Sequence, residues 1–181
     1  MQRVFIGIPV DRLAQQKINE LLIPEQQSNP DIRWVPEHNR HLTLAFLGNR
    51  PAGVIENLCR SMDQAYQREP GFKMGPSRLE RFPNSSGNII ALVFKSDARL
   101  SRLYQATQEL LVANGFDFSR TQFRPHITLG RLKAHSRLNK NFQQSANIRL
   151  QVGKITFYQS KLTQSGSIYH ALKESRLNKS E

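Results

Sequence analysis

Apolar and polar residues form strand-like and helix-like patterns along the whole chain, separated by polar breaks. Apolar runs rich in β-branched and aromatic residues predict strands, whereas apolar positions three or four residues apart predict amphipathic helices. The predicted strands cover residues 4–9, 41–47, 72–82, 88–94, 123–132, 148–160 and 167–172. The predicted helices cover residues 12–23, 51–65 and 98–114. Since strands and helices do not strictly alternate, this order predicts an α+β fold with largely antiparallel sheets.

Several boundaries follow from individual residues. Asp11 is expected to cap the first helix, whose apolar side includes Leu13, and Pro24 is expected to end it. Residues 25–40 are polar, contain two prolines and predict a loop. The 181 residues suit one domain, which we expect to span residues 1–173 and to be followed by a flexible C-terminal tail at residues 174–181.

One pattern occurs twice, as His-apolar-Thr-Leu at residues 41–44 and 126–129. Each copy follows a polar stretch, and the third predicted helix precedes the second copy much as the first helix precedes the first copy. Alternate residues of a strand point to the same face, so each copy presents its histidine and threonine together and turns its apolar residues to the core. A duplicated half-domain would place the two copies facing each other across a pseudo-two-fold axis.

These four polar side chains suit in-line displacement at phosphorus. Because imidazole has an ordinary pKa of about 6.5, one ring can accept a proton near pH 7 while the other donates one. Threonine hydroxyls can donate hydrogen bonds to phosphate oxygens. A strained five-membered cyclic phosphodiester is already activated, so no metal and no covalent intermediate is required. A single His-x-Thr on a strand is usually structural, but two copies with matched apolar backing favour a functional reading.

The two segments, Arg-His-Leu-Thr-Leu-Ala-Phe-Leu-Gly at residues 40–48 and Phe-Arg-Pro-His-Ile-Thr-Leu-Gly-Arg at residues 123–131, resemble the paired motifs of the two-histidine (2H) phosphoesterases. Within that superfamily the chain looks most like the LigT-like RNA 2′,3′-cyclic phosphodiesterases. The likeness extends to the opening strand at residues 3–9, to Trp34-Val-Pro and to the closing Ser-Gly-Ser-Ile-Tyr169, so it covers nearly the whole chain.

The resemblance implies a bilobal duplicated α+β fold, with two mainly antiparallel sheets around a central cleft and helices on the outside. It also implies metal-independent opening of a terminal 2′,3′-cyclic phosphate of RNA to a 2′-phosphate, with 2′-5′ RNA ligase activity as a further property and no cofactor. By position, His41 would protonate the leaving 3′-oxygen, His126 would activate water, and Thr43 and Thr128 would hold the phosphate. The sequence itself does not assign acid and base, because the two motifs are nearly symmetric.

Two arginines are further candidates for binding substrate. Arg124 has the same strand parity as His126 and is expected to point into the cleft. Arg131 has the opposite parity, so it reaches the cleft only if a β-bulge at Gly130 changes the register. Otherwise Arg131 is a solvent-facing charge.

Other candidate chemistry is weaker. His38 and His41 form a His-x-x-His, but no third ligand is evident, so no metal site is expected. His135 and His170 are expected to be incidental. Trp34, Phe123 and Tyr169 could stack on a terminal base, although core packing is favoured for Phe123. A single cysteine excludes an internal disulfide framework.

Charge favours a polyanionic partner. The chain has a net charge of +12, and residues 91–181 carry fifteen Lys and Arg against five Asp and Glu. Such a field attracts RNA, although it also serves solubility. With no apolar run long enough for a membrane span, we expect a cytoplasmic monomer that acts on RNA ends. The alternatives are a phosphodiesterase of small cyclic phosphates, such as nucleotide or ADP-ribose derivatives, and a non-catalytic RNA-binding module.

Overall fold

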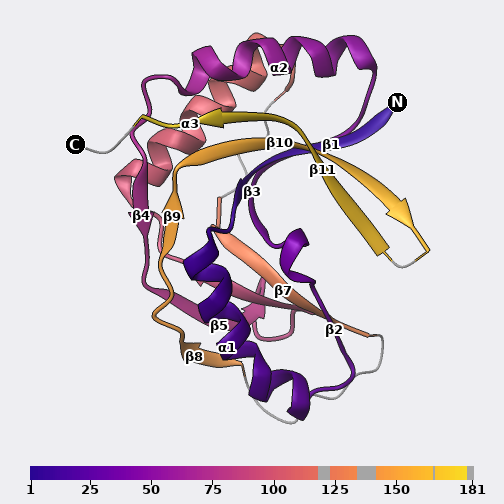
Figure 1. The fold of residues 1–181 in the computed structure, drawn as a ribbon, viewed down its shortest axis with the longest axis vertical. Helices are drawn as coiled ribbons and strands as arrows, with labels where there is room; N and C mark the ends of the chain where they lie inside the picture. The colour runs from indigo at the N-terminus through magenta and orange to yellow at the C-terminus, as the bar shows by residue number, and fades with distance from the viewer. Residues whose placement is uncertain (118–122, 134–141, 165, 179–181) are drawn as a thin grey trace.

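The computed structural model describes residues 1–117, 123–133, 142–164 and 166–178 of the chain (Figure 1). These residues form three α-helices and eleven strands, and the strands make two sheets in which all neighbours are antiparallel. The predicted α+β fold with mainly antiparallel sheets is therefore confirmed. None of the helices in the described residues is both long and apolar enough to cross a membrane.

The larger sheet has nine strands, and its first half contains the first His-x-Thr motif. The strand order in this half is β11-β10-β1-β3. The bounds are β1 (Gln2–Pro9), β3 (His41–Arg50), β10 (Lys154–Thr163) and β11 (Gly166–Arg176). His41 is therefore the first residue of β3.

The second half of this sheet contains the second motif, in the order β7-β6-β5-β8, and β2 also pairs with β7. The bounds are β2 (Ile32–Trp34), β5 (Ser77–Phe82), β6 (Ile89–Phe94), β7 (His126–Leu132) and β8 (Gln143–Ser145). His126 is the first residue of β7. A separate two-stranded sheet pairs β4 (Phe72–Met74) with β9 (Leu150–Val152).

The two halves of the large sheet are joined where the two motif strands meet. The register between β3 and β7 consists of one pair, Leu42 opposite Ile127, and both side chains are fully buried. The two sheets expected around a cleft are thus two halves of one sheet with a narrow junction. If the pairing of Leu42 with Ile127 is extended by one residue along both strands, His41 lies toward Thr128 and Thr43 lies toward His126.

A strand, a helix and a later strand that pairs with the first occur twice, as β1-α1-β3, in which β2 precedes β3, and as β6-α3-β7. In each unit the outer strands pair antiparallel with each other. The helices are α1 (Arg12–Ser28), α2 (Ala52–Tyr66) and α3 (Ala98–Ala113). In Figure 1, α2 and α3 lie together beside the first half of the sheet, and α1 lies beside the second half. Three contacts between elements agree with this placement: Tyr66 of α2 bonds Thr107 of α3, Lys173 of β11 bonds Asp63 of α2, and Gln144 of β8 bonds Glu25 of α1.

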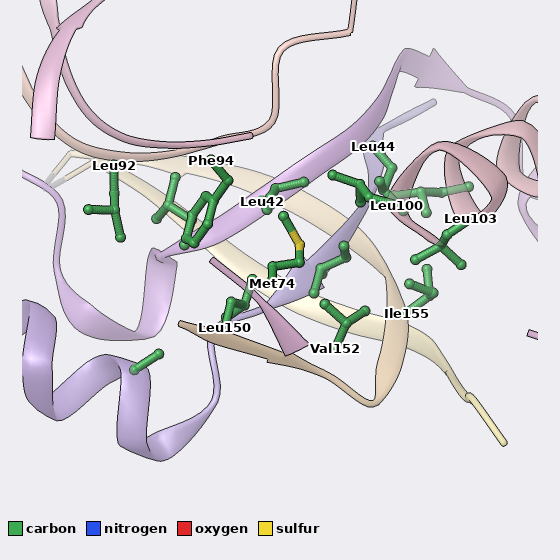
Figure 2. Packing of buried hydrophobic residues seen from close by; sticks show 14 of the residues in the cluster. Leu42, Leu44, Met74, Leu92, Phe94, Leu100, Leu103, Leu150, Val152 and Ile155 are labelled. Carbon is green, nitrogen blue, oxygen red and sulfur yellow. The ribbon is translucent and has the colours of Figure 1, made fainter. Parts of the chain in front are cut away.

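The apolar core extends behind the motif strands. Leu42 and Leu44, the apolar residues of the first motif, are 0% and 4% exposed. Figure 2 shows them among buried side chains from both sheets and α3. Ile127 and Leu129 of the second motif are also buried in this core. The alternation read from the sequence is therefore correct on the core side of both strands, which turns the polar residues to the opposite face.

The first helix differs from its prediction. Asp11 caps it as expected, with its carboxylate accepting from the amides of Leu13 and Ala14. The helix does not end at Pro24 but continues for four residues beyond it. A proline removes one helical hydrogen bond, but packing can retain the helix around it, and here Glu25 in the next turn is 2% exposed. Leu13 is 62% exposed, because the buried stripe lies on the neighbouring residues of the helix.

Three other predictions are wrong in part. The expected loop at residues 25–40 contains the end of α1, strand β2 and a short 3₁₀ helix, η1 (Glu37–Asn39). The flexible tail was predicted to begin at residue 174, which is too early. Strand β11 continues to Arg176, and the next residue, Leu177, is buried at 8% exposed. Residues 179–181 lie outside the described part. The single strand predicted over residues 72–82 is two strands, β4 and β5, which belong to different sheets.

Candidate active site

A cavity of about 540 Å³ lies on the polar face of the two motif strands. Both motif strands contribute to it, and their first residues, His41 and His126, are among the residues that line it. The cavity is lined by every site residue expected from the sequence: His41, Thr43, Arg124, His126, Thr128 and Arg131. The duplication thus brings the two His-x-Thr motifs together as predicted.

Each imidazole is fixed by the same backbone hydrogen bond. Nδ1 of His41 lies 2.8 Å from the carbonyl oxygen of Asn39, and Nδ1 of His126 lies 2.8 Å from that of Arg124. A carbonyl oxygen only accepts hydrogen bonds, so Nδ1 carries the hydrogen and donates it in both rings. Nε2 of each ring is then the nitrogen that exchanges protons at the cavity.

His41 sits in an aromatic pocket. Its ring lies 4.6 Å from that of Phe5, and Tyr169 meets it edge-on with the ring centroids 5.2 Å apart. Burial among these rings lowers the pKa of His41 to about 4, against the opposing effect of the hydrogen bond to Asn39. The charge of a protonated His126 lowers the pKa of His41 further. His41 is therefore neutral at pH 7 in the free protein.

His126 stacks on a different ring. Phe82 of β5 lies 3.9 Å from it, with the two planes 22° apart. Burial lowers the pKa of His126, and the charges of Arg124 and Arg131 lower it further. The hydrogen bond to the carbonyl of Arg124 acts in the opposite direction. Both histidines are thus biased toward the neutral form in the free protein.

A β-bulge follows the threonine of each motif. Against β1, Thr43 pairs with Gly7 and Ala45 with Ile6, so Leu44 is the extra residue. Against β6, the same shift makes Leu129 the extra residue between Thr128 and Gly130. An extra residue reverses the parity of the strand beyond it, which explains how Arg131 reaches the cavity. A bulge at Gly130 was the predicted condition for this placement; a bulge is present, with the neighbouring Leu129 as its extra residue.

The first motif has the equivalent bulge, and the residue equivalent to Arg131 is Phe46. Phe46 also lines the cavity, and its side chain is 67% exposed. One wall of the cavity therefore presents an aromatic ring where the other presents a guanidinium. Phe46 was not among the residues predicted to line the site, although its equivalence to Arg131 is visible when the two motifs are aligned.

Arg124 lines the cavity as expected, but its guanidinium is engaged by the protein. It lies 4.8 Å above the ring of Phe82, donates a hydrogen bond to the carbonyl of Pro83 and forms an ion pair with Glu80. Its backbone carbonyl holds Nδ1 of His126. These contacts hold Arg124 against the Phe82 ring on which His126 stacks, and its role in binding substrate stays a prediction.

The segment before His41 also positions the site, which the loop prediction missed. Asn39 donates from its side-chain amide to the carbonyl of Ser167, 2.7 Å away, and so attaches η1 to β11. Arg40 is buried and donates to the side-chain oxygens of Gln15 and Asn19 in α1. No local pattern indicates these contacts, because their partners lie far away in the sequence.

The remaining candidate residues from the sequence either lie away from the cavity or line it without a predicted chemical role. His38 and His170 are exposed, and His135 lies outside the described residues. Within the described residues no group of three or more His, Cys, Asp or Glu side chains is placed to hold a metal ion. Phe123 stacks on Tyr104 at 4.0 Å, and both rings line the cavity.

We expect the buried state of His41 to make the protein less stable at acidic pH. Because the pKa of His41 is about 4 in the folded protein and the ordinary imidazole pKa of about 6.5 applies in the unfolded chain, unfolded chains bind a proton that folded chains do not. This stability is present above pH 6.5 and is lost as the pH falls toward 4, by about 3 kcal/mol. Urea unfolding of the wild type and of His41→Gln at pH 7 and pH 4 measures it. Equal losses in both proteins would contradict the prediction.

Comparison with known proteins places the chain in a family. A family model described as LigT-like phosphoesterase matches residues 8–90 and 93–169. An RNA 2′,3′-cyclic phosphodiesterase from Thermotoga maritima is 29% identical over 180 residues, which cover 95% of this chain and 94% of that protein. One from Geobacillus stearothermophilus is 32% identical over 128 residues, which cover 70% of this chain but 41% of that protein.

Solved structures agree with this placement. The crystal structure of Escherichia coli LigT complexed with 3′-AMP has a TM-score of 0.78 and 26% identity, and the match covers 97% of this chain and 98% of that one. A crystal structure described as a phosphoesterase has a TM-score of 0.79 and 25% identity, with 98% and 99% covered. With the paired His-x-Thr strands at one cavity and a family model that matches most of its length, the chain belongs to the LigT-like phosphoesterases.

Proposed function

We propose that this protein hydrolyses terminal 2′,3′-cyclic phosphates of RNA to 2′-phosphates, using His41 and His126 as its two proton-transfer groups. The main support is that both imidazoles line one cavity and that Nδ1 of each donates a hydrogen bond to a backbone carbonyl. This leaves the two Nε2 atoms to act on one substrate. The relatives named RNA 2′,3′-cyclic phosphodiesterase and the neighbour that holds 3′-AMP support this choice of substrate. The cytoplasmic location and the monomeric state stay predictions.

The reaction proceeds by in-line displacement. Thr43 and Thr128 donate hydrogen bonds to the non-bridging oxygens of the cyclic phosphate. One imidazole takes a proton from water, whose oxygen bonds to phosphorus as the bond to the 3′-oxygen breaks. The other imidazole, protonated at Nε2, gives its proton to that 3′-oxygen, and a 2′-phosphate results. A 5′-hydroxyl in place of water would form a 2′-5′ linkage by the same steps.

The anionic substrate sets the protonation state that this scheme requires. Both histidines have lowered pKa values in the free protein, so a bound phosphodiester must raise the pKa of the acid. A nearby opposite charge favours the protonated imidazole. The repulsion between the two rings then keeps the second one neutral, as a base must be. The family resemblance makes His41 the acid and His126 the base.

Phosphorus NMR tests the function directly. Purified protein is incubated with adenosine 2′,3′-cyclic phosphate and with an oligonucleotide ending in the same group, both in the presence of a chelator. We expect the cyclic phosphate signal to be replaced by that of a 2′-monophosphate. A 3′-monophosphate would mean that the 2′-oxygen leaves instead. Binding of the oligonucleotide without any product would support the non-catalytic RNA-binding alternative, and a preference for the mononucleotide would support small cyclic phosphates as substrates.

A further inference from the structure

A second, smaller groove continues from the active-site cavity. Its volume is about 170 Å³, and its walls include Arg33, Trp34, Leu162 and Gly166. We call it the outer groove. It shares Val35, Asn39, Arg131 and Tyr169 with the cavity. A ligand held at the histidines can therefore continue into the outer groove without leaving the protein surface.

The outer groove concentrates positive charge. Arg33 of β2 lies directly opposite Arg131 of β7 in the antiparallel register, and both line the groove. Like charges directly opposite each other in a sheet are destabilising. The described residues that line the groove include no Asp or Glu. An anion between the two guanidinium groups would offset their repulsion.

Arg33 reaches across the groove toward the β10–β11 turn. A Cβ at Gly166 would come within 2.6 Å of Nη2 of Arg33, so the guanidinium packs against the backbone of Gly166, where a side chain would not fit. Gly166 also has a φ of +130°, which side-chain-bearing residues rarely adopt. The guanidinium of Arg33 is thus placed between β2 and the hairpin, over the groove.

Two buried polar atoms at the groove lack a hydrogen-bond partner within the described protein: Nε1 of Trp34, a donor, and Oδ1 of Asn39, an acceptor. Asn39 is only 9% exposed. Buried polar atoms in native proteins are normally paired. Both atoms are closed off from solvent, so what the groove itself presents to a ligand is its two cations and an apolar contact from Leu162, which is 86% exposed.

We propose that the outer groove binds the phosphodiester that links the terminal nucleotide of the RNA to its 5′ neighbour, with Arg33 and Arg131 as its cationic partners. This inference rests on the proposed function. A chain whose 3′ end carries the cyclic phosphate continues only in the 5′ direction, so the adjoining cationic groove receives that linkage. Arg131 lines both the cavity and the outer groove, so it lies where the terminal nucleotide would pass from one to the other.

Calorimetric binding tests this without turnover. The ligands are adenosine 2′-phosphate, the dinucleotide ApA ending in a 2′-phosphate, and the same dinucleotide with a neutral methylphosphonate linkage. We expect the wild type to bind the charged dinucleotide about tenfold more tightly than the mononucleotide, as for one charge-assisted hydrogen bond. The methylphosphonate is expected to lose this gain, and so is Arg33→Gln with the charged dinucleotide. Arg78→Gln is the matched control, because Arg78 is exposed on β5 and lines neither site.

The inference is overturned if the wild type binds the charged dinucleotide no better than the mononucleotide or the methylphosphonate. It is also overturned if Arg33→Gln keeps the full dinucleotide gain. Should Arg33→Gln fail to fold, the three ligands with the wild type still decide the question. Hydrolysis of adenosine 2′,3′-cyclic phosphate, measured in parallel, reports on the proposed function alone, so the two ideas can fail separately.

Discussion

Replacing either His41 or His126 with glutamine is expected to lower kcat for a cyclic phosphate by about 10²–10⁴-fold, the usual contribution of a general acid or base. Each ring is the sole proton-transfer group on its side of the phosphate in the proposed scheme. Steady-state hydrolysis of adenosine 2′,3′-cyclic phosphate measures the loss. His170→Gln is the control, because His170 is exposed on β11 and does not line the cavity. A histidine variant that retains more than about a tenth of the wild-type rate would contradict its acid–base role.

The same variants separate acid from base. With a 4-nitrophenyl phosphodiester, whose leaving group needs little protonation, the variant lacking the acid regains much of its rate and the variant lacking the base does not. We expect His41→Gln to be the variant that recovers. In the free protein His41 has a pKa of about 4, so this role depends on the substrate's charge raising that value. Recovery of His126→Gln instead would exchange the two roles.

Leu42→Ala is expected to have the second-largest effect, because Leu42 is half of the pair that joins the two halves of the sheet. Loss of this fully buried side chain leaves a cavity and lowers the free energy of unfolding by about 2–5 kcal/mol. Leu42 lies between His41 and Thr43, so relaxation around the cavity displaces the catalytic groups. We expect kcat to fall by about tenfold or more, since small misplacements are costly in catalysis.

The control for this variant is Leu22→Ala in α1, whose side chain is also fully buried but lies away from the junction. Urea unfolding gives the stability of both variants, and initial rates are compared at a temperature where both are folded. A similar loss of stability with unchanged kcat is expected for Leu22→Ala. If both variants lose kcat equally, the junction has no special part in aligning the site.

The sequence was sufficient for the features that depend on local pattern. The period of two in the motifs predicts which side chains enter the core, and Leu42 and Ile127 are buried accordingly. The repeated motif predicts that the histidines meet, because duplicated units pack face to face. Even Arg131 follows from one local condition, a bulge beside Gly130, which the register of β6 and β7 meets.

Features that depend on distant partners were not predictable. Strand β2 has three residues and forms only because β7 supplies its hydrogen bonds, so residues 25–40 resemble a loop on their own. The end of β11 is fixed by pairing with β10, where Lys154 lies opposite Arg176. Helix α1 passes Pro24 because tertiary burial outweighs a local preference. Composition alone indicates none of these pairings.

The unequal pair Phe46 and Arg131 has a consequence for how a substrate enters. Two identical half-sites would accept a phosphodiester in either of two directions, related by the pseudo-symmetry of the fold. A nucleotide is itself asymmetric, with a flat base at one end and a charged backbone at the other. The ring of Phe46 on one wall and the cation of Arg131 on the other match this asymmetry in only one orientation of the nucleotide. The difference between Phe46 and Arg131 therefore gives the two-fold arrangement of the motifs a direction, and in the proposed reaction this direction would favour departure of one oxygen over the other.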